Sequence, residues 1–167
     1  MKRRATKEKS LSQQLAQELA AVCQKESDMT FKDIVNSYRI IERTALARVS
    51  DNQFLALETR RRVAERLAYT AIYKDRPWED SRGLLDELIR LGFTNIEVKV
   101  NVLLSYSKYC LKIGRNKEGI ALLEPLETEL ETELSRKDLR TPARRFYSVE
   151  LKSTRALLNK LRAASTT

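Results

Sequence analysis

Apolar residues recur every three or four positions along almost the whole chain, which is the spacing of α-helices that bury one face. Leu11, Leu15 and Leu19 begin one such stripe, and Ile34 and Tyr38 belong to the next. Extended along the sequence, the pattern predicts seven helices joined by short connections. They cover about residues 10–26, 31–49, 54–74, 77–91, 96–113, 116–134 and 142–163.

The segment 96–102 alternates between apolar and polar residues and is rich in β-branched side chains, which is typical of a strand. The apolar positions continue without a break through Leu103, Leu104 and Tyr106, and a single strand would find no partner in this chain. We therefore predict a helix here and an all-α fold class. The alternatives within that class are an array of helical hairpins and an irregular α-bundle.

Spacing also predicts which side chains are buried. On the third helix, Phe54, Leu57 and Arg61 fall on the same face as Ala64 and Leu67, so we expect that face to be packed along its whole length. Glu58, Glu65 and Glu87 fall on or near polar helix faces. The tyrosines are expected at the edge of the core with their hydroxyls reaching water; these are Tyr38, Tyr69, Tyr106 and Tyr109.

Composition then excludes several kinds of chemistry. The chain has no His and two Cys, too few ligands for the usual zinc site, and no imidazole is present for acid–base or nucleophilic catalysis. Cys23 and Cys110 show no motif spacing and are predicted to be small core residues in a reducing compartment, with a disulfide between them left open. The sequence predicts neither a metal site nor a cofactor, and a protein that is not an enzyme.

Length and hydropathy indicate one domain over residues 10–163, with disordered tails at 1–9 and 164–167. No stretch is apolar enough for a membrane span. The basic start is not followed by the apolar region of a signal peptide. We therefore expect a cytoplasmic protein.

Residues 64–91 and 102–130 form two similar helix-turn-helix units. Gly119 and Ser107 are small residues that let two helix backbones approach closely, with Ser81 and Tyr69 as their counterparts 38 residues upstream. The segment 103–123 resembles a tetratricopeptide repeat, and the resemblance extends over about residues 64–130. The family's early Trp and closing Pro are not in register here, and its usual period is shorter.

The resemblance implies a groove, lined by the first helix of each unit, that binds a peptide or helix of a partner protein. Its residues would be Val63, Arg66, Thr70, Tyr73, Lys74, Asn101, Leu104, Lys108, Leu111 and Lys112. The cations among them suggest an acidic ligand. The alternative is that Arg66, Lys74, Lys108 and Lys112 only solvate an exposed face.

Charge raises a second hypothesis. The net charge is +9, with cations concentrated at 136–162 and six glutamates at 117–134. The acidic and basic helices either neutralise each other by packing antiparallel, or the basic segments bind RNA or DNA phosphates. The candidate nucleic-acid residues are Arg60, Arg61, Arg62, Arg140, Arg144, Arg145, Lys152 and Arg155, aided by the basic N-terminal tail.

The sequence thus favours a non-catalytic interaction module, an adaptor or scaffold that binds an acidic or amphipathic segment of a partner protein. Leu104, Leu111 and Tyr73 would be its apolar anchors. A basic nucleic-acid-associated protein is the alternative, and a homodimer stays open.

Overall fold

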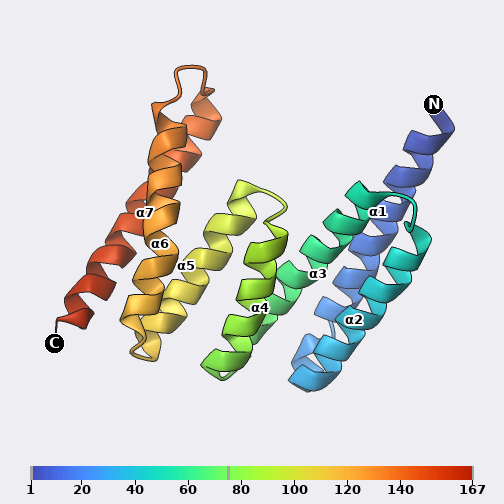
Figure 1. The fold of residues 1–167 in the computed structure, drawn as a ribbon, viewed down its shortest axis with the longest axis horizontal. Coiled ribbons are helices and arrows are strands. Elements are labelled where there is room, and N and C mark those ends of the chain that lie inside the picture. Colours follow the sequence, from blue (N-terminus) through green and yellow to red (C-terminus); the bar gives the residue numbers. More distant parts are fainter. Residues whose placement is uncertain (1, 75, 167) are drawn as a thin grey trace. The chain divides into compact units, whose positions relative to one another are not determined.

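The fold is all-α, as the spacing predicts. The computed structural model describes residues 2–74 and 76–166, and side chains from residue 11 onward; this part of the chain contains seven α-helices, one short 3₁₀ helix and no strand (Figure 1). The elements are α1 (Lys2–Cys23), η1 (Glu26–Asp28), α2 (Phe31–Arg48), α3 (Gln53–Tyr73), α4 (Trp78–Leu91), α5 (Ile96–Lys112), α6 (Asn116–Ser135) and α7 (Thr141–Ser165).

These helices group into two compact units. Unit 1 covers 1–94 and contains α1 to α4, and unit 2 covers 95–167 and contains α5 to α7. Helix α1 begins at Lys2 and α7 ends at Ser165, so helix extends into both segments that were expected to be disordered. Lys, Arg, Ala and Glu dominate residues 2–9 and all favour helix, which explains the earlier start.

Asparagine and threonine caps explain where three of the helices begin. The side-chain oxygens of Thr30, Asn52 and Asn95 accept hydrogen bonds from backbone N–H groups three residues later. Such a cap satisfies one of the N–H groups that a helix start leaves without a partner. The Asn95 cap supplies the local reason why the alternating segment after it becomes α5 and not a strand.

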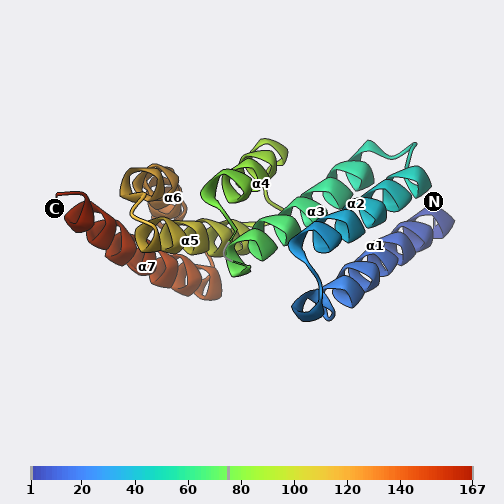
Figure 2. The same cartoon turned by 90° about the horizontal axis from the view of Figure 1, so that it is seen from below.

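Unit 1 buries a core in which α1, α2 and α3 pack together (Figure 2). Its fully buried side chains include Ile34 and Tyr38 from α2 and Val63 and Leu67 from α3. Leu15 and Leu19 of α1 close one side of this core.

The first two turns of α3 differ from the expectation. Phe54 is 71% exposed and Leu57 is 37% exposed. Arg61 contacts the carboxyl-terminal end of α4, where its Nε donates to the carbonyl of Leu91 at 2.6 Å. Since α4 ends at that residue, the turns of α3 before Arg61 extend past the helix that would cover them. Periodicity predicts a face, but not how far a neighbouring helix reaches along it.

In unit 2, α5 and α6 form a hairpin whose contact depends on small residues. Ser107 Oγ donates to the carbonyl of Gly119 at 3.2 Å, and both residues are buried. A Cβ on Gly119 would lie only 3.1 Å from Cβ of Cys110 and 3.0 Å from Leu161 on α7. This confirms the predicted close approach of α5 and α6 and adds α7 to the contact.

The turns after α3 and α5 share one hydrogen-bond pattern. Arg76 N donates to Ala71 O at 3.0 Å, and Arg115 N donates to Cys110 O at 2.8 Å. Each bond spans five residues, and the two are 39 residues apart. The first helices of the hairpins therefore correspond at an offset of 39, which matches Ser107 with Ala68. Ala68 is small and fully buried, so the larger Tyr69 was the wrong counterpart.

Two helical glycines test the packing at Gly119. Gly83 in α4 has open space around it, so Gly83→Ala should raise the free energy of unfolding by about 1 kcal/mol through helix propensity alone. In Gly119→Ala the new methyl group crowds Cys110 and Leu161, so we expect this variant not to show that increase in the free energy of unfolding. Urea unfolding followed by circular dichroism measures both variants, and an equal gain for the two would contradict a tight α5–α6 contact.

Candidate functional site

Four of the predicted groove residues come together at the carboxyl-terminal end of α3. Arg66, Thr70, Tyr73 and Lys74 lie beside the corner formed by the end of α1 and the helix η1. Tyr73 is 86% exposed and Arg66 is exposed, whereas Thr70 is buried and Lys74 is half-buried. The four residues therefore divide into two that face solvent and two that contact the corner.

The corner is joined to α3 through Glu26. Its carboxylate accepts hydrogen bonds from the hydroxyl of Tyr38 on α2 and from Thr70 Oγ1 at 3.2 Å. Its backbone carbonyl accepts from Lys74 Nζ at 2.6 Å. One residue of η1 thus connects α2 and α3, and it uses the polar groups of Thr70 and Lys74 to do so.

Tyr38 is fully buried, contrary to the expectation that its hydroxyl reaches water. Burial raises the pKa of Tyr38 far above its ordinary value, and the hydrogen bond to the Glu26 carboxylate raises it further. The neutral phenol is the form that donates to Glu26, so the native fold strongly favours the protonated side chain.

A hollow of about 490 Å³ lies between this corner and α3. Its lining residues are Cys23, Glu26, Ser27, Arg66, Tyr69, Thr70 and Tyr73. Cys23 is exposed, so the prediction of a core residue is wrong for Cys23 and confirmed for Cys110, and the two cysteines are not joined by a disulfide. The Cys23 sulfur lies 3.9 Å from a guanidinium nitrogen of Arg66.

Aromatic rings and one guanidinium give this hollow its chemistry. Tyr69 is half-buried, and burial together with the charge of Glu65 raises its pKa. The oxygens of the Glu26 carboxylate already accept hydrogen bonds from Tyr38 and Thr70, so the Arg66 guanidinium is the charged group of the hollow that can donate to a ligand. A guanidinium beside tyrosine rings suits a carboxylate flanked by an apolar or aromatic group.

Val63, also predicted to line the groove, is fully buried on α3, so that prediction is wrong. The other predicted groove residues belong to unit 2. Asn101, Lys108 and Lys112 are exposed on α5, whereas Leu104 is buried and Leu111 is half-buried. The expectation that Leu104 is an apolar anchor is therefore wrong. Of the three predicted apolar anchors, Tyr73 is the most exposed.

The nucleic-acid candidates also divide by their contacts. Arg61 donates to a helix carbonyl, and Arg62 pairs with Glu58 at 2.5 Å. Arg144 donates to the carbonyls of Leu134 and Arg136 at the end of α6. The others are Arg155, which pairs with two glutamates of α6, and Arg60, Arg140, Arg145 and Lys152, which are exposed.

Helices α6 and α7 pack antiparallel and neutralise each other along one edge. Arg162 pairs with Glu124, and further along Arg155 pairs with Glu127 at 2.8 Å and with Glu131. The remaining glutamates of α6 also have cationic partners. Of the two alternatives for the acidic and basic helices, antiparallel packing with mutual neutralisation is thus observed. Each exposed pair contributes little alone, but together they set the register of the two helices.

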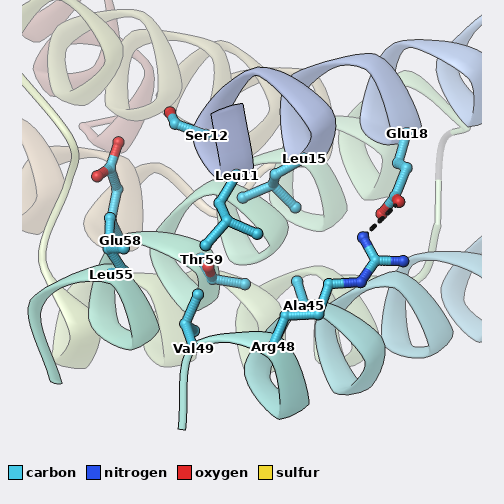
Figure 3. A pocket seen from close by; sticks show the side chains of 10 residues that line it. All are labelled: Leu11, Ser12, Leu15, Glu18, Ala45, Arg48, Val49, Leu55, Glu58 and Thr59. Carbon is cyan, nitrogen blue, oxygen red and sulfur yellow. Dashed lines mark hydrogen bonds and ion pairs between the residues drawn. The ribbon is translucent and has the colours of Figure 1, made fainter. Parts of the chain in front are cut away.

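A second hollow lies between α1, α2 and the start of α3 (Figure 3). Leu11 and Leu15 point from α1 toward Val49 and Thr59, and the ion pair between Glu18 and Arg48 lies at one side. Its volume of about 20 Å³ has room for about one water molecule and for no larger ligand.

Among the described residues, no group of His, Cys, Asp and Glu could hold a metal ion. Glu65 is buried and accepts a hydrogen bond from Thr94 N at 2.7 Å, so the helix face on which it lies is covered, contrary to the expectation of a polar face, and its carboxylate holds the chain after α4.

None of the helices in the described part of the chain is both long and apolar enough to cross a membrane. No protein-family model, curated protein or solved structure matches this chain.

The buried phenol predicts a stability loss at high pH. An unfolded tyrosine ionises near pH 10, while native Tyr38 stays protonated, so its stabilisation is present below about pH 10 and is lost as the pH rises. We expect Tyr38→Phe to make the free energy of unfolding of unit 1 fall less steeply above that pH. The difference in slope should approach 1.4 kcal/mol per pH unit.

Urea unfolding at about pH 9 and about pH 11, followed by the fluorescence of Trp78, measures this slope. Trp78 is the single tryptophan and lies in unit 1. The matched control is Tyr73→Phe, which changes an exposed phenol and should keep the wild-type slope. Equal slopes for Tyr38→Phe and the wild type would show that Tyr38 does not carry the effect.

Proposed function

We propose that this chain is a non-catalytic protein-interaction module that binds an acidic or amphipathic segment of a partner protein at the carboxyl-terminal end of α3. The observation that carries the proposal is the hollow in which Arg66, Tyr69 and Tyr73 meet solvent beside the Glu26 corner. Arginine and tyrosine are the residue types on which protein interfaces most often depend.

Each side chain has a separate role in this proposal. Arg66 binds a carboxylate of the partner segment through its planar guanidinium, and the rings of Tyr69 and Tyr73 pack against an apolar neighbour of that carboxylate. Thr70 and Lys74 position the site and do not bind the ligand, because both are hydrogen-bonded to Glu26. The site is thereby ordered before the ligand arrives, which lowers the entropic cost of association.

The two hairpins support the tetratricopeptide-like part of the proposal. They have the same turn hydrogen bonds, and small residues occupy corresponding positions at Ala68 and Ser107. In that family the first helix of a hairpin lines the ligand groove, and α3 and α5 are these helices. Within unit 2, Lys108 and Lys112 are exposed on α5.

The proposal places the protein in the cytoplasm. The two cysteines, one exposed and one buried, form no disulfide with each other, which suits a reducing compartment.

Selection from a display library of random peptides tests the proposal. We expect acidic peptides with interspersed apolar residues to be enriched by the wild-type chain. Arg66→Glu and Tyr73→Ala should each weaken the binding of a selected peptide at least about tenfold, measured by fluorescence anisotropy. The matched controls are Lys32→Glu and Ile40→Ala, which change exposed side chains on α2 and should leave the affinity unchanged.

Two results would overturn the proposal. One is a selection that enriches no acidic sequence above background. The other is a selected peptide whose affinity does not change in Arg66→Glu and Tyr73→Ala. Loss of binding in both the site variants and the controls would also contradict it, since the control positions lie outside the hollow.

A further inference from the structure

The cations of unit 2 fall into two sets according to the contacts they make. One set faces acidic or carbonyl groups: Lys99, Arg115, Arg136, Arg144, Arg155 and Arg162 all have such partners. The other set includes Arg145, Lys152 and Lys160, which are exposed on α7 and make no ion pair within the described part of the chain. Unit 2 also has exposed cations outside this set, among them Lys108 on α5 and Lys117 on α6, so α7 carries a group of three exposed cations and not all of them.

These three cations share one face of α7. Arg145 and Lys152 are seven residues apart, or about two helical turns, so they lie almost directly in line about 10 Å apart. Lys160 lies about 12 Å further along the axis and is rotated by about 80° from Lys152, so the three cations occupy one broad side of the helix. The core residues of α7 occupy the opposite face, with Thr154, Leu158 and Leu161 buried. The single acidic residue of α7, Glu150, is half-buried and belongs to the core side. The outer face of α7 therefore carries cations and no acidic residue.

The rest of that face is small or polar. Between the cations lie Ser148, Ser153, Ala156 and Asn159, all exposed. Val149, at 53% exposure, is the one large apolar residue of α7 among the exposed ones in the described chain. A helix that lies on a membrane needs a bulky apolar face, and a peptide-binding surface needs a desolvated anchor. This face offers neither, whereas phosphate contacts require only cations that solvent can reach.

We propose that the outer face of α7 binds the phosphodiester backbone of nucleic acid, RNA or DNA, without reading its sequence. Arg145, Lys152 and Lys160 each contact a phosphate, and the small residues between them let the strand approach the helix. This site replaces the eight-residue set suggested by composition, since Arg61, Arg62, Arg144 and Arg155 already have partners within the chain.

The inference is independent of the peptide site, because it concerns unit 2 and a different ligand. Neither a failed peptide selection nor a failed nucleic-acid titration bears on the other proposal.

A salt titration by fluorescence anisotropy tests the inference, with a labelled single-stranded RNA and a labelled duplex DNA of unrelated sequences as probes. Three phosphate contacts predict that log K falls with log salt concentration with a slope of about −2.7 for the duplex and about −2.1 for the single strand. Affinity should not depend on the probe's sequence. The triple variant Arg145→Glu, Lys152→Glu, Lys160→Glu should bind at least about tenfold more weakly at the same salt concentration.

The matched control reverses three exposed lysines elsewhere, Lys25→Glu, Lys32→Glu and Lys117→Glu, with the same change in net charge. It should retain most of the affinity and the wild-type slope. Equal losses in the two triple variants would overturn the inference, because binding would then follow net charge and not this face. Absence of binding by the wild-type chain, or binding only to vesicles of anionic lipid, would overturn it as well.

Discussion

The carboxylate of Glu26 connects the parts of unit 1 that form its candidate site. It lies in the short helix between α1 and α2, yet it accepts from Tyr38 and Thr70, while its carbonyl accepts from Lys74. A partly buried carboxylate without such donors would be costly, so the corner and the end of α3 are stable only together. The exposure of Arg66 and Tyr73 follows, since the hollow they line is the space left beside this contact.

Unit 2 depends on a different constraint, the antiparallel contact between an acidic helix and a basic one. Its ion pairs use the arginines on one edge of α7 and leave the lysines and Arg145 on the other. The same arrangement that neutralises α6 therefore creates a one-sided distribution of charge. Small residues at the α5–α6 contact bring the third helix close, so Leu161 of α7 also packs against Gly119.

Sequence spacing predicted the helices well because each has a local cause: a cap such as Asn95, a stop such as Gly92 or Gly114 at positive φ, and a periodic apolar face. Arg66 and Tyr73 were predicted from the tetratricopeptide resemblance, which assigns them to the first helix of a hairpin. The contacts of Glu26 were not, because nothing in the sequence places a carboxylate in a connection next to a tyrosine 12 residues away. The exposure of Phe54 and Leu57, likewise, depends on where α4 ends.

Glu26 is expected to order the end of α3 and with it the candidate site. Hydrogen–deuterium exchange of the wild-type chain and of Glu26→Ala measures this effect. We expect peptides covering residues 23–30 and 66–74 to lose protection together in the variant, while peptides from α5 to α7 exchange as in the wild type. Unchanged exchange in both segments, or faster exchange in 23–30 alone, would contradict it.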